Sequence, residues 1–322
     1  MSTILVTGGA GFIGSYLCEP LLASGHRVLC ADNLSSGSRE NVKTLLKHPQ
    51  FRFIEHNVQV PLKLSEPVDA IYHLASRASP ADFGPHGLDI LMTNSIGTLN
   101  LLNLAKEHRA KLLFASTSEV YGEPAVSPQP ETYWGNVNPN GPRSVYDESK
   151  RFGEALCMAF HRTHGLDVRI ARLFNTFGPR MRMNDGRVVP NFILQALADK
   201  PLTLYGDGSQ TRSMCYVTDT VSGLIALMTK APPASVTNIG TDRELTMREL
   251  AELVLKLTES KSKLAKLPAL PDDPTRRKPE LGRAKALGWS AQVSLEDGLR
   301  ETIAYYQARL PAEGCSPDAG PL

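Results

Sequence analysis

Residues 4–15, ILVTGGAGFIGS, decide the fold of this chain. The apolar run from Ile4 to Thr7 is short, rich in β-branched residues and ended by glycines, as expected of a buried strand in a parallel sheet. Apolar residues then recur at helical spacing, at Phe12, Ile13, Tyr16, Leu17, Leu21 and Leu22. A strand that passes through glycines directly into a helix is the first unit of an α/β sheet.

The same alternation repeats along the first half of the chain. Further strand-like runs lie at 27–31, 51–55, 70–75, 111–116 and 167–173, separated by segments able to form helices. Such alternation implies right-handed crossovers, so the sequence predicts an α/β fold with a doubly wound parallel sheet of the Rossmann type. Beyond about residue 175 the sequence contains more Pro and Gly. It predicts a smaller α/β part there, with helices at 191–200, 219–230, 246–257 and 295–309 and a strand at 236–239.

The composition favours small-molecule chemistry in a reducing compartment. The 322 residues carry 35 Lys+Arg and 33 Asp+Glu, and the net charge of +2 gives no reason to expect a nucleic-acid or membrane partner. The five cysteines are widely spaced without a C-x-x-C pair, so we predict neither a disulfide framework nor a metal site. The opening MSTILVTGG has no basic segment and only a short apolar run, unlike a signal peptide or an anchor. We therefore expect a cytoplasmic protein.

The glycine-rich turn predicts a phosphate-binding site. Gly8, Gly11 and Gly14 have a G-x-x-G-x-x-G spacing between the first strand and the first helix. Missing β-carbons let the backbone approach a pyrophosphate, and the helix start at Phe12 and Ile13 supplies free N–H groups with a favourable dipole. The alternative is a glycine turn that only lets the helix pack against the strand.

Asp32 extends this pattern to a dinucleotide. It ends the second strand 24 residues after Gly8 and is followed by Asn33. A carboxylate at that place accepts hydrogen bonds from an adenosine ribose and repels a 2′-phosphate, which favours NAD over NADP. Arg39 lies a few residues further on, where it is able to hold a 2′-phosphate, so NADP stays open as the alternative.

Tyr146 and Lys150 predict acid–base chemistry. They lie four apart in a stretch with helical periodicity, 145–160, and so share one helix face. An ammonium close to a phenol favours the phenolate and lowers its pKa from about 10 towards the range of a general base. The positive ring of NAD+ acts in the same direction. A Y-x-x-x-K pair is common, however, and a surface-exposed pair is the alternative interpretation.

Motifs along the whole chain carry a resemblance. They are GGAGFIGS at 8–15, YHLAS at 72–76, NSIGT at 94–98, STSEVYG at 116–122, YDESK at 146–150 and FNTFGPR at 174–180. With these, the chain resembles an extended short-chain dehydrogenase/reductase that modifies nucleotide sugars. Longer stretches are most similar to UDP-glucuronate decarboxylases, the UDP-xylose synthases: YWGNVNPNGPR at 133–143, RMRMNDGRVVPNFILQAL at 180–197, GDGSQTR at 206–212 and DDPTRRKPE at 272–280. The likeness runs from about residue 3 to 305.

The resemblance implies a division of the chain and a reaction. It implies an NAD-binding Rossmann domain at 1–175, to which parts of the later chain return, and a mainly nucleotide-sugar-binding domain at 176–310. The composition of 311–322, PAEGCSPDAGPL, predicts a flexible tail. In the reaction, carbon 4 of UDP-glucuronate is oxidised, the resulting β-keto acid loses CO2, and the ketone is reduced to UDP-xylose. NAD is recycled in each turnover and stays bound.

The resemblance also implies roles for individual residues. The catalytic residues are Thr117, Tyr146 and Lys150 around carbon 4, Glu119 beside the reacting sugar, and Arg277 near its carboxylate. Cofactor contacts extend to Leu74, Ala75, Ser76 and Asn94. Substrate contacts comprise Arg77, Ser118, Asn175, Val188, Arg212 and Arg277, and the stretch 188–192 holds the uridine diphosphate. Arg276 is adjacent to Arg277, so the assignment between the two is open, and a solvated basic patch or a solvated loop carboxylate remains the alternative for Arg277 and Glu119.

Some positions separate the possible outcomes. Related 4,6-dehydratases carry Asp where this chain has Ser118, which disfavours water elimination, and typical 4-epimerases have small residues in place of Glu119. Arg77 stands where the family usually has Pro, the next stretch to 94 also departs, and Ser149 replaces a Gly. An arginine that clamps the carboxylate would prevent its loss and lead to UDP-glucuronate 4-epimerisation. A non-catalytic NAD-binding regulator is the further alternative.

The resemblance finally implies a homodimer through helices at about 87–107 and 144–164. Apolar positions for that contact are Leu88, Leu91, Met92, Leu99 and Leu102, which are equally compatible with a core. His73 and His161 lack metal-like partners in the sequence and are expected to be structural. The sequence leaves open the pathway and the strictness for uracil.

Overall fold

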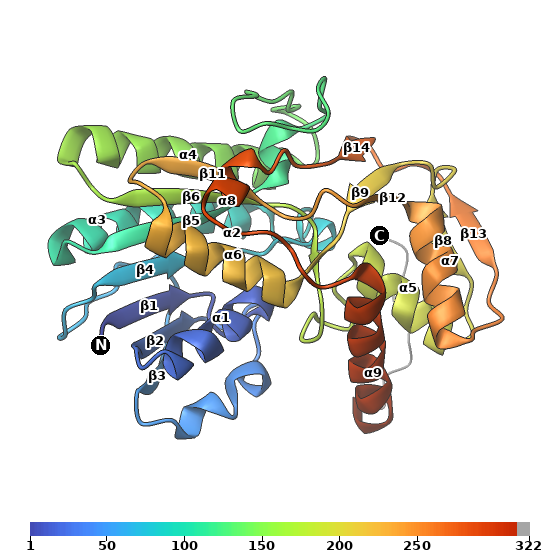
Figure 1. Cartoon of the computed structure of the whole chain (residues 1–322), viewed down its shortest axis with the longest axis horizontal. Coiled ribbons are helices and arrows are strands. Elements are labelled where there is room, and N and C mark those ends of the chain that lie inside the picture. The colour runs from blue at the N-terminus through green and yellow to red at the C-terminus, as the bar shows by residue number, and fades with distance from the viewer. Residues whose placement is uncertain (314–322) are drawn as a thin grey trace.

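The computed structural model describes residues 1–313. Its main sheet has seven strands in the order β11-β6-β5-β4-β1-β2-β3 (Figure 1). Every neighbouring pair in this sheet is parallel, so the predicted doubly wound α/β fold is confirmed. The strands are β1 (Thr3–Thr7), β2 (Arg27–Asp32), β3 (Phe51–Glu55), β4 (Ala70–His73), β5 (Lys111–Thr117), β6 (Val168–Leu173) and β11 (Ser235–Ile239).

Helices cover both faces of this sheet (Figure 1). On one face α1 (Phe12–Ala23) packs against α6 (Val217–Lys230). On the other face α4 (Ser144–His164) contacts both α2 (Gly87–Met92) and α3 (Thr98–His108). The chain passes from α2 to α3 through a π-helical turn, η4 (Thr93–Gly97). Two separate apolar clusters fill the space between the sheet and its two helical layers.

The later chain forms a smaller part beside the carboxyl ends of the strands. Its helices α5 (Val188–Leu197), α7 (Met247–Thr258) and α9 (Leu295–Glu313) pack on one another. The short strands there are β7 (Thr176–Phe177) with β10 (Cys215–Tyr216), β8 (Leu202–Tyr205) with β13 (Leu264–Leu267), and β9 (Thr211–Ser213) between β12 (Glu244–Thr246) and β14 (Arg276–Arg277). A short helix, α8 (Gly282–Ala286), contacts β11. Because α6 and β11 return to the main sheet, residue 175 is not a clean boundary.

Local sequence explains where α7 begins. Thr246 accepts a hydrogen bond from the backbone N–H of Glu249, and the Glu249 carboxylate accepts one from the backbone N–H of Thr246. This reciprocal pair satisfies N–H groups that the first helical turn leaves without partners. The predicted helix at 246–257 therefore matches α7 closely. The predicted tail starts inside α9, and residues 314–322 lie outside the described residues.

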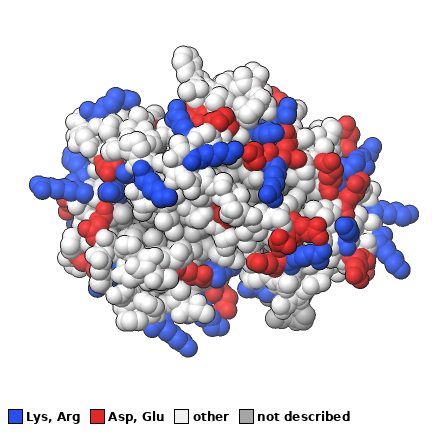
Figure 2. All heavy atoms as spheres, in the orientation of Figure 1, with Lys and Arg blue, Asp and Glu red and all other residues white. Residues whose placement is uncertain are grey.

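Several expected features can be compared with the described part of the chain. Cys18, Cys30, Cys157 and Cys215 are buried free thiols, whereas Cys315 lies outside the described residues. Within residues 1–313, no cluster of side chains suited to a metal ion is present. No helix in that range combines the length and the apolar character needed to cross a bilayer. Figure 2 shows basic and acidic side chains interspersed over the face in view.

Candidate active site

A large cavity lies at the carboxyl ends of the parallel strands. Residues that directly follow β1, β2, β4, β5 and β6 line it, as expected for a doubly wound sheet. The predicted site residues found in its wall are Gly8, Gly11, Phe12, Ile13, Gly14, Asp32, Asn33, Leu74, Ala75, Ser76, Arg77, Thr117, Ser118, Glu119, Tyr146, Lys150, Asn175, Val188, Arg212 and Arg277. Asn94 is the predicted residue that the structure leaves out of the wall.

The glycine turn is folded so tightly that side chains do not fit. A Cβ atom on Gly14 would lie 2.1 Å from the carbonyl oxygen of Gly8, and one on Gly8 would lie 2.7 Å from the backbone nitrogen of Ala75. Gly8 also has a φ of +69°, which favours glycine. Helix α1 starts directly after this turn and has no acidic residue in its first turn. The amino end of α1 is therefore suited to a bound pyrophosphate.

Asp32 closes the other end of this cradle. Its carboxylate accepts hydrogen bonds from the backbone N–H groups of Ala10 and Leu34, at 3.0 and 2.8 Å. Burial raises the pKa of Asp32 from its usual value, and these backbone hydrogen bonds act in the opposite direction. Arg39 pairs instead with Glu55 at 2.8 Å and does not line the cavity. The residues present thus fit a dinucleotide with a free ribose hydroxyl.

Tyr146 and Lys150 project from α4 into the buried centre of the cavity. Both side chains are buried, which excludes the exposed-pair interpretation. The ring of Tyr146 stacks on Phe83, with ring centroids 5.2 Å apart and planes inclined by 17°. The Lys150 ammonium donates a hydrogen bond to the carbonyl oxygen of Ala115 at 2.8 Å and lies 5.8 Å from the centroid of the Tyr146 ring.

The electrostatics of this pair differ from the sequence prediction. Burial raises the pKa of Tyr146 well above its usual value, while a hydrogen bond with Thr117 acts to lower it. Burial also lowers the pKa of Lys150 to about 7. In the protein without a bound cofactor the pKa of Tyr146 is therefore raised and not lowered, because burial removes solvation from the phenolate.

Glu119 lies between two arginines from distant segments. Its two carboxylate oxygens pair with Arg143 at 2.9 Å and with Arg277 at 2.6 Å. Burial acts to raise the pKa of Glu119, but Arg277 and Arg143 together hold it below its usual value. All three side chains are buried in the cavity wall. Glu119 is therefore a buried carboxylate and not a solvated loop residue.

This cluster continues to Arg212 and carries a surplus of positive charge. Asp273 pairs with Arg212 at 2.8 Å and with Arg143 at 3.8 Å. Three guanidinium groups, of Arg143, Arg212 and Arg277, thus face two carboxylates, of Glu119 and Asp273. Burial, with Arg277 nearby, lowers the pKa of Arg212 to about 10. The wall is consequently suited to an anionic ligand.

Several buried polar atoms in the same wall lack hydrogen-bond partners within the described residues. They are Nε of Arg77, Arg143 and Arg277, and Oδ1 of Asn175 and Asn191. Buried polar atoms normally find a hydrogen-bond partner, so these donors and acceptors indicate a polar ligand. Arg143 was missed as a site residue by the sequence reasoning. It ends the motif at 133–143 directly before α4, but its approach to Glu119 depends on tertiary packing.

Arg276 and Arg277 point to different surroundings. Arg277 lines the cavity, whereas the Arg276 side chain is 52% exposed and pairs with Glu244 at 2.7 Å outside it. Strand β14 causes this split, because successive side chains of a strand alternate in direction. Of the two arginines, Arg277 is the candidate for substrate contact.

Asn94, predicted to contact the cofactor, lies outside the cavity wall and against α4. Its amide group donates a hydrogen bond to the hydroxyl of Ser149 at 3.0 Å, and that hydroxyl donates one to the backbone oxygen of Tyr146. Ser149, noted above as a departure from the family, thus directs the Asn94 side chain towards α4. The amide nitrogen thus finds its partner on the neighbouring helix, whereas the amide oxygen Oδ1 has no hydrogen-bond partner within the described residues.

Arg77, predicted to contact the substrate, lies in the cavity wall and contacts charged and polar groups of this chain. Its guanidinium pairs with Asp82 and Asp89 at 3.5 and 3.6 Å and donates a hydrogen bond to the backbone oxygen of Ser35 at 2.7 Å. Its charge is therefore already compensated by this chain. Ser35 follows Asp32 closely, so the contacts of Arg77 reach the cofactor side of the cavity.

Comparison with known proteins agrees with this geometry. The family model described as "NAD dependent epimerase/dehydratase family" matches residues 4–240, about three quarters of the chain. The chain belongs to the NAD-dependent epimerase/dehydratase family. NAD is accordingly the dinucleotide of the glycine cradle, and the extended short-chain dehydrogenase/reductase resemblance is confirmed.

Similar members of the epimerase/dehydratase family modify nucleotide sugars. The chain is 52% identical to UDP-glucuronic acid decarboxylase 1 of Danio rerio over 308 residues, 95% of this chain and 73% of that protein. It is 51% identical to UDP-glucuronic acid decarboxylase 3 of Arabidopsis thaliana, over 92% of this chain and 86% of that one. A solved UDP-glucuronic acid 4-epimerase from Bacillus cereus, in complex with UDP-glucuronic acid and NAD, superposes with a TM-score of 0.85 at 30% identity, covering 95% of this chain and 99% of the other.

Proposed function

We propose that this chain is an NAD-dependent UDP-glucuronate decarboxylase that forms UDP-xylose. The observation that carries the proposal is the buried Glu119 held between Arg143 and Arg277, beside Thr117, Tyr146 and Lys150 in one cavity. This arrangement combines groups for oxidising a sugar alcohol with guanidinium groups for a sugar carboxylate. The UDP-glucuronic acid decarboxylases, which are 52% and 51% identical to this chain, support the same substrate and the same reaction.

Tyr146 is the proposed base at carbon 4. Its phenolate oxygen takes the proton of the sugar alcohol, while Thr117 forms a hydrogen bond there that acts to lower the pKa of Tyr146. Stacking on Phe83 fixes the ring plane. NAD supplies the hydride acceptor and a positive charge when it is bound, and that charge favours the phenolate that burial alone disfavours. Lys150 is held by the Ala115 carbonyl and orients the cofactor ribose.

The arginine cluster serves the carboxylate and the phosphates. Arg277 has a buried Nε without a partner in the described residues, so it is the proposed ligand of the glucuronate carboxylate before CO2 leaves. Glu119 keeps Arg277 and Arg143 apart and oriented through its two oxygens. Arg212, Asn175 and the stretch from Val188 are proposed to bind the uridine diphosphate. Ser118 has no carboxylate with which to assist loss of water.

The 4-epimerase alternative is retained because of one comparison. The Bacillus cereus 4-epimerase shares the fold and was solved in complex with UDP-glucuronic acid and NAD. The specific reason to expect epimerisation here, a carboxylate clamp by Arg77, is weakened by the pairing of Arg77 with Asp82 and Asp89. Decarboxylation is therefore the favoured outcome.

A homodimer is proposed from the apolar surface of α2, η4 and α4. Leu88, Met92 and Ile96 follow one another at intervals of four and are exposed, as is Phe152 on α4. Leu102, proposed from the sequence for this contact, is fully buried and belongs to the core, while Ile96 and Phe152 were missed. Exposed apolar side chains on adjacent helices are typical of a subunit contact.

Product identification tests the proposed function directly. Purified protein is incubated with UDP-glucuronate and NAD+, and the nucleotide sugar is analysed by mass spectrometry and by chromatography against UDP-xylose. We expect a UDP-pentose lighter than the substrate by one CO2, without net NADH. An isomer with unchanged mass identifies the 4-epimerase, and unchanged substrate contradicts both functions.

A further inference from the structure

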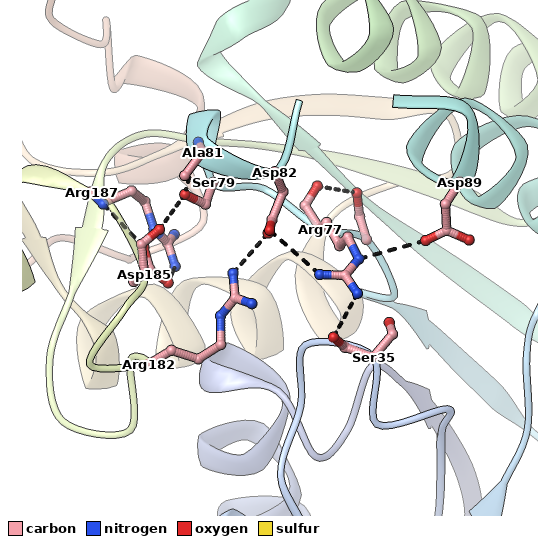
Figure 3. A network of polar contacts seen from close by, with 10 residues as sticks. Ser35, Arg77, Ser79, Ala81, Asp82, Asp89, Arg182, Asp185 and Arg187 are labelled. Carbon is pink, nitrogen blue, oxygen red and sulfur yellow. Dashed lines mark hydrogen bonds and ion pairs between the residues drawn. The ribbon is translucent and has the colours of Figure 1, made fainter. Parts of the chain in front are cut away.

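Arg77 is part of a charged network that crosses the cavity on its cofactor side (Figure 3). We name this network the clasp and define it as Ser35, Arg77, Asp82, Asp89 and Arg182. Arg77 pairs with Asp82 and Asp89 at 3.5 and 3.6 Å and donates a hydrogen bond to the Ser35 backbone oxygen. Asp82 pairs in addition with Arg182 at 2.7 Å.

The clasp joins three segments that are far apart in the sequence. Ser35 lies in the loop after β2, Asp82 ends the short helix η3 (Pro80–Asp82), and Arg182 lies between β7 and α5. The continuous path Ser35–Arg77–Asp82–Arg182 therefore connects the loop that follows the ribose-binding Asp32 with the later part of the chain (Figure 3). Four clasp residues precede residue 175, and Arg182 follows it.

Further contacts hold the segment 180–185 across the cavity. Arg180 pairs with Glu19 on α1 at 2.6 Å and lies 4.3 Å from the centroid of the Tyr16 ring. The Ser79 hydroxyl donates a hydrogen bond to the backbone oxygen of Asp185. The segment is thus tied to the glycine-turn helix on one side and to the loop after β4 on the other.

Burial and charge balance determine what the clasp is able to do. Ser35, Arg77, Asp82, Asp89 and Arg182 all line the same cavity as Gly8, Asp32 and Tyr146. Two arginines face two aspartates, so the clasp has no surplus charge with which to attract a substrate carboxylate. The Arg77 side chain is only 11% exposed, and ion pairs at such low exposure are disrupted at a larger free-energy cost than surface pairs. The clasp is therefore suited to holding segments together over a bound molecule.

The proposed reaction has a stage at which such a closure matters. The hydride taken from carbon 4 must return after CO2 has left. If the reduced cofactor leaves first, the balance is UDP-glucuronate plus NAD+ giving UDP-4-ketopentose, CO2 and NADH. The proton released when the alcohol is oxidised is balanced by the proton taken up at carbon 5 after CO2 leaves. If the reduced cofactor stays bound, the ketone is reduced and NAD+ is regenerated.

We propose that the clasp is a positioning element that retains the dinucleotide between oxidation and reduction, and so makes the pentose rather than the ketopentose the product. The part of this inference that concerns the sugar product rests on the proposed function. The part that concerns retention of the dinucleotide rests only on NAD as the cofactor, which follows from the family assignment.

The binding arm measures dissociation without any sugar. NADH is bound to the purified protein and chased with excess NAD+, and the loss of bound-NADH fluorescence gives the dissociation rate. Arg77→Met removes the centre of the clasp, and Arg182→Met removes its more exposed end. Arg300→Met is the matched control, because Arg300 pairs with Glu296 at 2.6 Å on α9, is 58% exposed and does not line the cavity.

We expect dissociation to be at least about tenfold faster in Arg77→Met and Arg182→Met and unchanged in Arg300→Met. With UDP-glucuronate, the two clasp variants release ketopentose and equal amounts of NADH, while the wild type releases UDP-xylose. Wild-type dissociation rates in both clasp variants overturn the proposal. Should Arg77→Met fail to fold, Arg182→Met alone decides. Because the chase contains no sugar, failure of the clasp and failure of the decarboxylase assignment are seen separately.

Discussion

At the scale of single residues, neighbours decide the role of chemically similar groups. Arg276 and Arg277 are adjacent in the sequence, yet one pairs with Glu244 at the surface and the other with Glu119 in the cavity. Exposed ion pairs contribute about 0–1 kcal/mol, whereas a buried carboxylate left without its partner is unfavourable by several kcal/mol. The site therefore depends on Arg277 far more than on Arg276.

This difference gives a matched pair of variants. Arg277→Gln is expected to lower kcat/KM with UDP-glucuronate by about 10²-fold or more, since it removes the proposed carboxylate ligand and a partner of Glu119. Arg276→Gln is expected to stay within about twofold of the wild type. Steady-state kinetics with both variants check this, and NAD binding in Arg277→Gln shows that the cofactor end is intact. Equal losses in the two variants would contradict the assignment.

His73 predicts how stability depends on pH. It is buried between the hydroxyls of Thr7 and Thr98, at 2.9 and 3.1 Å, and burial lowers the pKa of His73 to about 3. In the unfolded chain its pKa is about 6.5, so below that pH the unfolded state binds a proton that the folded state does not. The stabilising contribution is complete above about pH 6.5 and is lost progressively down to about pH 3.

We expect His73 to account for about 2 kcal/mol of lost stability between pH 7 and pH 5. Chemical denaturation at the two pH values measures it. His73→Gln, which is destabilised at both, should show a pH difference smaller by about that amount. The same pH difference in wild type and variant would show that His73 does not titrate in this way.

At the scale of elements, the join between β1 and α1 is tightly constrained. A Cβ atom on Gly14 would lie 2.1 Å from the carbonyl oxygen of Gly8. The turn is able to form because glycine has no Cβ atom. Gly84 offers a contrast, because a Cβ there meets nothing within 4 Å. The glycines of the turn are therefore required by the close approach of backbone to backbone and not by flexibility.

Gly14→Ala tests how the turn contributes to stability and to NAD binding. We expect destabilisation of about 1–3 kcal/mol and a loss of NAD affinity of at least about tenfold, because the clash moves the amino end of α1. Gly84→Ala should leave both unchanged. Thermal denaturation and titration with NAD+ measure the two effects, and unaltered NAD affinity in Gly14→Ala would be inconsistent with the proposed cradle.

The elements also show what the sequence allows one to predict. Strands β1 to β6 and the main helices follow from local apolar periodicity, and the residues Thr117, Tyr146 and Lys150 follow from motifs. The placement of β11 next to β6 does not, because the pairing joins residues more than sixty apart. Nor do the pairing of Arg143 with Glu119 or that of Arg77 with Asp89, since both depend on how loops meet over the sheet.

At the scale of the whole molecule, the described chain leaves apolar side chains in water. Leu88 is 76% and Phe152 50% exposed, on helices that contact each other. A second copy covering α2 and α4 would remove this surface from water. Helix α4, from which Tyr146 and Lys150 line the cavity, would then belong both to the candidate site and to the subunit contact.

Phe152→Glu tests this arrangement. We expect the variant to shift from dimer to monomer in light scattering after size exclusion, because a buried unpaired carboxylate disfavours association. Leu46→Glu, which changes an exposed apolar residue outside these helices, should remain dimeric. A wild-type protein that is monomeric at micromolar concentration would rule out the proposed contact.

In the proposed reaction, carbon 4 gives up a hydride and receives the same one back after CO2 has left. UDP-glucuronate carrying deuterium at carbon 4 tests it in a single reaction with the wild-type protein. We expect UDP-xylose that retains deuterium at carbon 4, with one CO2 released for each pentose. A pentose without deuterium, or a labelled product that keeps its carboxylate, would contradict it.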